Sequence, residues 1–116
     1  MAKLTRNQNA IIAILTEYHE LLTRSTTIGA ADVRDELVID TKHNHFQLVT
    51  LGWQQQRFFH ETNIHIDIFG QKIWIQQNNT EFDIVEELLA RGIAASDIVL
   101  GFIAPSVRKD TGFAVA

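Results

Sequence analysis

The sequence contains no cysteine and only one proline, Pro105, among its 116 residues. Without cysteine the chain has no disulfide framework, no zinc site built on thiolates and no cysteine nucleophile. This composition suits a reducing compartment, so we expect a cytoplasmic protein. The single proline and the six scattered glycines mark no linker, and we therefore predict one domain over residues 1–116.

Long hydrophobic runs are also missing. Near the N-terminus the apolar residues are interrupted by three consecutive amide side chains at positions 7–9. A membrane-spanning helix needs about 20 predominantly apolar residues, and a signal peptide needs an uninterrupted apolar segment. We therefore expect neither a signal peptide nor a membrane span.

Positive charge is scarce. The chain has 10 Lys and Arg residues against 14 Asp and Glu residues, which gives a formal net charge of −4. Proteins that bind nucleic acid by neutralising phosphates present a basic patch. Here the basic residues are scattered, apart from Arg108 and Lys109, which Asp110 follows. The charge balance favours a protein partner, with DNA reached only indirectly, and direct DNA contact through Arg108 and Lys109 is the alternative.

Two helices are predicted from the spacing of apolar residues. The first covers residues 3–24, where apolar side chains recur at intervals of three, four and seven. Its stripe consists of Leu4, Ile11, Ile12, Leu15, Tyr18 and Leu22. Residues 25–29, which include Thr26, Thr27 and Gly29, are expected to end it. The second helix begins after Thr80, a suitable N-cap with Asp83 three residues later, and ends at Gly92.

Residues 33–53 are predicted to form a β-hairpin with strands over 33–41 and 45–53. We place a two-residue turn at His43 and Asn44, because Asn tolerates the positive φ that such a turn requires. The resulting register gives the pairs Thr41–Phe46, Ile39–Leu48 and Leu37–Thr50 on one face, and Val38–Val49 on the other.

Residues 57–77 are predicted to form a second hairpin, in which isoleucines alternate with polar residues. With Gly70 and Gln71 as a type II′ turn, the register gives the core pairs Ile68–Ile73 and Ile66–Ile75 and the outward pairs Asp67–Trp74 and His65–Gln76. Trp74 then points away from both neighbouring isoleucines, and another part of the chain or a partner must cover it. The amides Asn78 and Asn79 are predicted to be a connection to the second helix and not a site.

Together these elements predict an α+β fold. It consists of an antiparallel sheet of about four strands in two hairpins, a long N-terminal helix and a second helix after the last strand. A short extended piece is expected over residues 98–102, and Phe113 and Val115 are expected to dock. The long helix and the aromatic outer sheet face offer more apolar surface than a small core needs, so we expect a homo-oligomer, dimeric or higher.

No catalytic arrangement is evident in the sequence. The glycines form no phosphate-binding loop, and no nucleophile elbow surrounds any of the serines, which are Ser25, Ser96 and Ser106. His43 and His45 flank the first turn, while His60, His65 and Asp67 lie on or near one strand. Imidazole and carboxylate groups are suitable metal ligands, but this spacing matches no closed site. We therefore predict a protein that is not an enzyme, with no metal and no cofactor.

Several short segments occur in a characteristic order. They are HFQLVTLGW (45–53), Arg57, HIDI (65–68), GQKIWIQQNNTE (70–81), EELLARGI (86–93), SDIVLGF (96–102), Pro105, Arg108 and TGFAVA (111–116). In this order and at this spacing they resemble the XisI family, the fdxN element excision controlling factor proteins of cyanobacteria. Ala94, where family members often carry a proline, and Lys109-Asp110 depart from the family pattern. Both departures are local and leave the fold assignment intact.

The resemblance implies an accessory factor, acting beside a recombinase, for excision of a DNA element during heterocyst differentiation. It also implies a companion protein, XisH, which resembles endonuclease-fold proteins, and it supplies no catalytic residues. We predict that the chain binds a XisH-like protein, and the candidate contact residues are Trp53, Arg57, His65, Trp74 and Arg108. Trp and Arg are enriched at interface hot spots. The competing interpretation is that the long helix or the tail covers both Trp side chains.

Two alternatives of other classes accompany this prediction. In one, the chain neutralises a toxic XisH-like protein, as an antitoxin does. In the other, it is a regulator that binds DNA directly.

Overall fold

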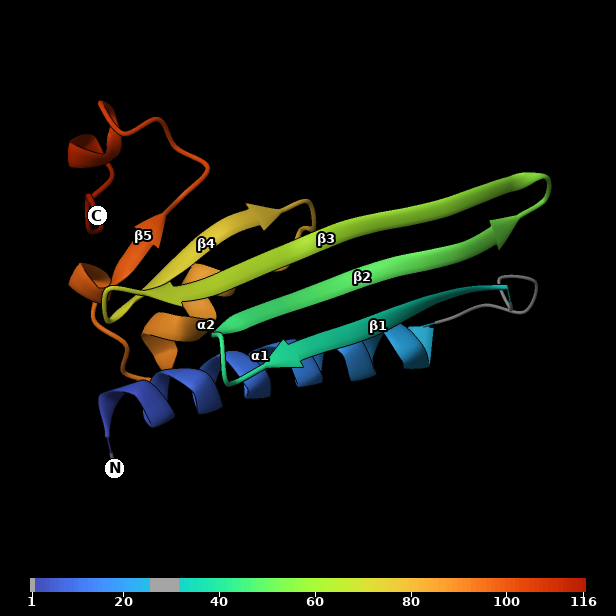
Figure 1. The fold of residues 1–116 in the computed structure, drawn as a ribbon, viewed down its shortest axis with the longest axis horizontal. Coiled ribbons are helices and arrows are strands. Elements are labelled where there is room, and N and C mark those ends of the chain that lie inside the picture. Colours follow the sequence, from blue (N-terminus) through green and yellow to red (C-terminus); the bar gives the residue numbers. More distant parts are fainter. Residues whose placement is uncertain (1, 26–31) are drawn as a thin grey trace.

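The computed structural model describes residues 2–25 and 32–116. The helices and strands are α1 (Lys3–Ser25), β1 (Val33–Asp40), β2 (His45–Gln54), β3 (Arg57–Phe69), β4 (Lys72–Asn78), α2 (Ile84–Ala90) and β5 (Ile98–Leu100). Single 3-10 turns lie at Ala95–Asp97 and Arg108–Asp110. The strands form one sheet in the order β1-β2-β3-β4-β5 (Figure 1). The predicted α+β fold is confirmed.

The sheet has five strands where the sequence predicted about four. Strands β1 to β4 pair antiparallel, whereas β5 pairs parallel to β4. A parallel neighbour requires a crossover connection, which α2 supplies. The three residues of β5 are too few to show a periodic pattern, so only the extended character of this segment was predictable.

Both helices lie on one face of the sheet, and the core fills the space between these two layers (Figure 1). Its fully buried members come from α1, β2, β3, β4, α2 and β5, whereas no residue of β1 is fully buried. Isoleucine dominates the set, which is Ile11, Ile14, Leu15, Phe46, Leu48, Ile64, Ile66, Ile73, Ile75, Ile84, Leu88 and Ile98. In the described residues, neither helix is long and apolar enough to cross a membrane.

The first helix is confirmed, but its buried face differs in two positions. Ile14, which was not in the predicted stripe, is completely buried, whereas Leu4 is 46% exposed. Tyr18 stacks on Phe82, with ring centroids 4.5 Å apart, and so joins α1 to the segment before α2. The predicted helix end at Thr26, Thr27 and Gly29 lies outside the described residues.

The predicted register of the first hairpin is wrong by two residues. Asp40 pairs with His45, so Ile39 faces Phe46 and Leu37 faces Leu48, and the Thr41–Phe46, Ile39–Leu48, Leu37–Thr50 and Val38–Val49 pairs do not form. The loop has four residues, 41–44, because the Asp40 carboxylate accepts hydrogen bonds from the backbone N–H groups of Lys42 and His43. A shift by two preserves the faces, so Leu37 and Ile39 share one face as predicted; Leu37 packs against the core, whereas Ile39 is 37% exposed.

The second hairpin follows the predicted register near its turn. Ile68 pairs with Ile73, Ile66 with Ile75 and Asp67 with Trp74. The turn itself differs, because both Gly70 (φ +58°) and Gln71 (φ +64°) have positive φ, as a type I′ turn requires and a type II′ turn does not. The predicted His65–Gln76 pair is also wrong: the register shifts after His65, which pairs with Gln77.

The connection to α2 uses a different cap from the predicted one. Asp83, and not Thr80, is the N-cap, and its side chain accepts a hydrogen bond from the Glu86 N–H. Thr80 instead bonds with Asn78 and accepts from the Phe82 N–H, which makes a compact turn at the end of β4. Gly92, with φ +87°, ends the helix as predicted.

Gly52 is the position where the sheet leaves no room for a side chain. Its φ is +137°, and an added Cβ would lie 1.8 Å from the Asp32 carbonyl oxygen. We predict that Gly52→Ala lowers the free energy of unfolding by more than about 2 kcal/mol, because backbone must move to relieve the overlap. Urea unfolding of the purified variant measures this loss.

Gly70→Ala is the matched control. Gly70 also has positive φ, but an added Cβ there meets nothing within 4 Å, so the expected cost is about 1 kcal/mol from the left-handed backbone alone. Equal losses for the two variants would show that β1 moves away from Gly52 without cost, contrary to this prediction.

Candidate functional site

The sheet face opposite the helices carries aromatic, histidine and carboxylate side chains. Trp74 lies on this face and is half-buried, while its neighbours Ile73 and Ile75 are buried on the core face. The prediction that Trp74 points away from the isoleucines is therefore confirmed. We refer below to this surface as the outer face.

The C-terminal segment of the chain covers Trp74. The Arg108 guanidinium lies over the indole, with its Cζ 5.2 Å from the ring centroid. It also donates hydrogen bonds to three backbone carbonyls of the same segment, those of Gly101, Ile103 and Val115. The segment then returns beside β5, where the Ala114 N–H donates to the Ile98 carbonyl at 2.8 Å (Figure 1). The protein itself thus supplies the cover that the sequence required for this Trp.

The far end of the β2–β3 hairpin carries a second group of aromatic residues. Trp53 and Phe58 are paired across the strands with ring centroids 5.2 Å apart, and they are 54% and 49% exposed. The Arg57 guanidinium lies 4.5 Å from the centroid of Phe59. In Figure 1 this hairpin end lies at the opposite end of the sheet from the C-terminal segment. We call this group the hairpin-end aromatics.

The five predicted contact residues therefore fall into two places. Trp53 and Arg57 belong to the hairpin end, while His65, Trp74 and Arg108 belong to the outer face. A strand rises about 3.3 Å per residue, so Arg57 and His65 are about 26 Å apart along β3. One small interface at either place does not include all five residues.

The pairing of β2 with β3 brings together three metal-ligating side chains. His45 lies directly opposite Asp67, and His65 precedes Asp67 by two residues on the same strand. Both His45 Nδ1 and His65 Nε2 lie 2.8 Å from Asp67 Oδ1, and Gln76 Nε2 donates to Asp67 Oδ2 at 3.3 Å. In the predicted fold His45 and Asp67 belong to separate hairpins, so this group was not predicted. Pairing the second predicted strand with the third was the signal that would have found it.

Hydrogen bonding controls the charge of Asp67. Its partial burial favours the neutral acid, but hydrogen bonds from His45, His65 and Gln76 outweigh burial and hold the pKa of the carboxyl below its usual value. The hydrogen bond to Asp67 in turn raises the pKa of the exposed His45 imidazole. The carboxylate at the centre of the group is therefore ionised at neutral pH.

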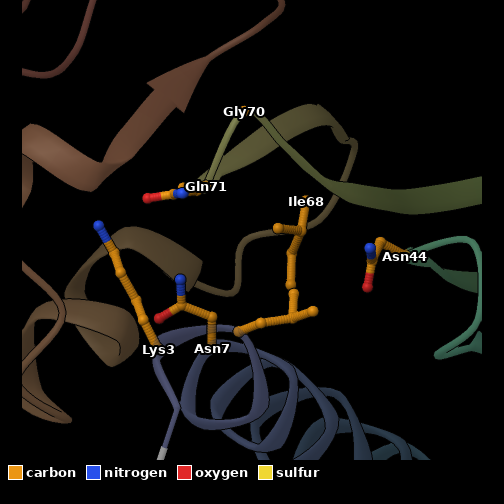
Figure 2. Close-up of a pocket in the computed structure, with 7 residues that line it drawn as sticks. Lys3, Asn7, Asn44, Ile68, Gly70 and Gln71 are labelled. Atoms are coloured by element: carbon orange, nitrogen blue, oxygen red, sulfur yellow. The ribbon is translucent and has the colours of Figure 1, made fainter.

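A cavity of about 390 Å³ lies at the N-terminal end of α1, and Figure 2 shows the residues around it. Asn7 is 2% exposed, and its Nδ2 has no hydrogen-bond partner among the described residues. The nearby Lys3 ammonium is paired with Asp97 at 2.9 Å. The cavity therefore contains the Asn7 amide nitrogen, which has no hydrogen-bond partner among the described residues, and the Lys3 ammonium, which is paired with Asp97. Its described lining contains no nucleophile beside a base.

Comparison with known proteins identifies the family. The family model described as XisI protein matches residues 1–115. The chain belongs to the XisI family. Comparison of this XisI-family chain with curated proteins gave no match.

Two solved structures share the fold of this XisI-family chain. The fdxN element excision controlling factor XisI from Anabaena variabilis is 34% identical with a TM-score of 0.85, and the alignment covers 99% of this chain and 100% of that one. A XisI-like protein from the same organism is 38% identical with a TM-score of 0.86, over 97% and 99% of the two chains. The resemblance predicted from the ordered sequence segments is confirmed.

The Arg108 contacts predict how the C-terminal segment is held. We expect Arg108→Gln to free this segment, because the variant loses the cation over Trp74 and charge-assisted hydrogen bonds to three carbonyls. Tryptophan fluorescence, measured in a Trp53→Phe background so that only Trp74 emits, should shift to longer wavelength. Limited proteolysis should cut sooner after Leu100.

Lys109→Gln is the control, because Lys109 is the exposed neighbour in the same 3-10 turn. It should change neither the emission nor the proteolysis rate. An Arg108→Gln variant with unchanged emission and unchanged cleavage would contradict the assigned role of Arg108.

Proposed function

We propose that this protein is a non-catalytic accessory factor that controls excision of a DNA element together with a XisH-like partner protein. The observation that carries this proposal is the end-to-end similarity to an fdxN element excision controlling factor, at 34% identity and a TM-score of 0.85. The family match over residues 1–115 supports the same conclusion.

The charge distribution supports indirect action on DNA. The net charge is −4, and Arg108 uses its guanidinium on Trp74 and on carbonyls of its own segment. Lys109 remains exposed, but Asp110 is beside it. Affinity for DNA depends on the number of phosphates that basic side chains neutralise. Arg108 and Lys109 are therefore expected to contribute little to binding of a DNA duplex.

The hairpin-end aromatics are the surface best suited to the protein partner. Trp53 and Phe58 form an exposed aromatic pair, and Arg57 is exposed beside them. Large aromatic residues and Arg dominate the binding energy of many interfaces. Trp74, in contrast, is already in contact with Arg108 and Phe69. We therefore place the main partner contact at the hairpin end.

Co-purification with a XisH-like protein tests this assignment. We expect Trp53→Ala to weaken binding by at least about tenfold, because truncation of an aromatic hot-spot residue costs about 2 kcal/mol or more. Biolayer interferometry with the purified partner measures the dissociation constant of each variant.

Phe69→Ala is the matched control, because Phe69 is also aromatic, lies at the other end of β3 and is 73% exposed. Its affinity should remain within about twofold of the unmodified protein. If Phe69→Ala weakens binding and Trp53→Ala does not, the partner binds the outer face near Trp74. If the unmodified protein does not bind the XisH-like protein, the proposed function itself is wrong.

We also propose that the protein self-associates. The apolar stripe of α1 does not provide the interface. Ile11, Ile14 and Leu15 are used in the protein's own core, so the remaining basis is the exposed apolar surface and the single-sided pairing of β1 at the sheet edge. Light scattering at micromolar concentration should give at least the mass of a dimer. A mass near 13.2 kDa would contradict this proposal.

A further inference from the structure

We propose that His45, His65 and Asp67 bind one divalent transition-metal ion of the Zn²⁺ class on the outer face of the sheet. The site does not depend on the proposed function. It rests on where β2 and β3 place three ligand side chains, which converge from two adjacent strands.

The backbone arrangement suits three ligands around one ion. His45 and Asp67 are directly opposite each other on neighbouring strands, and His65 lies diagonally from His45 on the same face. Directly opposite side chains in an antiparallel pair have Cβ atoms about 5 Å apart. Rigid strands therefore hold all three ligands within reach of a single ion, without any contribution from a loop interior.

The ligand atoms are already close to a coordination sphere. His45 Nδ1 and His65 Nε2 each lie 2.8 Å from Asp67 Oδ1, and all three ligand atoms lie within 4.8 Å of one another. Ligands about 2.0–2.1 Å from a tetrahedral Zn²⁺ are separated by about 3.4 Å. Rotation of the exposed His45 side chain closes the remaining difference, and the ion replaces the protons that now lie between the rings and the carboxylate.

The type of ligand selects the metal. Two imidazole nitrogens and one carboxylate oxygen favour Zn²⁺ and neighbouring transition metals, whereas Mg²⁺ and Ca²⁺ require sets dominated by oxygen. The ionised Asp67 offsets part of the charge of the ion. Three protein ligands leave a fourth position, and the exposure of the His45 side chain, 56%, opens that position to water or an external ligand.

Gln76 positions the carboxylate. Its Nε2 donates to Asp67 Oδ2 at 3.3 Å, which leaves Oδ1 for the metal. The Gln76 amide is held in turn against Gly101, where an added Cβ would lie 2.3 Å from Gln76 Oε1. Hydrogen bonds of this kind orient metal-ligating carboxylates and commonly change metal affinity by about 10–100-fold.

Isothermal titration of the chelator-treated protein with ZnCl₂ tests the site. We expect one Zn²⁺ per chain and no comparable heat with MgCl₂. His65→Ala and Asp67→Asn should each weaken Zn²⁺ binding by at least about tenfold. Co²⁺ should give the intense visible absorption of a four-coordinate ion, and this absorption should be lost in both variants.

His43→Ala and His60→Ala are the controls, since both are exposed histidines and neither belongs to the three-residue group; His43 lies two residues before His45, and His60 lies on β3 five residues before His65. Each should bind Zn²⁺ within about twofold of the unmodified protein. Circular dichroism checks that every variant is folded. Should Asp67→Asn fail to fold, the exposed His45→Ala replaces it with the same expected loss.

The thermal midpoint of the unmodified protein gives an independent measurement. Zn²⁺ in large excess over its dissociation constant should raise it by about 5 °C or more, and a chelator should reverse the rise. Absence of Zn²⁺ binding, binding unchanged in His65→Ala, or loss of binding in the His60→Ala control to the same extent would each overturn the proposal.

Discussion

The pairing of four isoleucines in the β3–β4 hairpin is the constraint on which the rest of the structure depends. Ile66 lies opposite Ile75 and Ile68 opposite Ile73, and this face packs under both helices. Because successive side chains of a strand point to opposite faces, a slip of one residue would bury Asp67 and Trp74 and expose the isoleucines. Burial of the core face therefore fixes the direction of every side chain on the outer face, including the candidate functional residues His65, Asp67 and Trp74.

Two register shifts in the long strands refine this arrangement. One lies between Leu48 and Val49 in the β2–β3 pairing, and the other between His65 and Ile66 in the β3–β4 pairing. The second shift leaves Gln76 as the extra residue of β4, so its amide reaches Asp67 and does not stand opposite His65. Such β-bulges redirect single side chains. The register shift after His65 therefore brings Gln76 to Asp67 in the histidine–carboxylate group, which consists of His45, His65 and Asp67.

The parts of the structure that the sequence predicted are those set by local pattern. Alternation in β3 and β4 was enough to place Trp74 on the outer face, and Asn44 takes the positive φ expected of it (φ +63°). The missed features involve residues far apart in the chain or competing polar side chains. His45 meets Asp67 across 22 positions, and Arg108 meets Trp74 through a return of the C-terminal segment. At α2 the predicted cap, Thr80, belongs to the turn after β4, and Asp83 caps the helix instead.

The two ends of β3 have become separate surfaces because the chain covers one of them. Arg108 and its segment lie over Trp74, whose side chain is half-buried and lies opposite Asp67. No described segment packs in the same way over Trp53 and Phe58. Sites more than about 10 Å apart that share no partner behave independently, and about 26 Å of strand separates Arg57 from His65. The proposed metal binding at one end and the proposed partner binding at the other are therefore expected to be energetically independent.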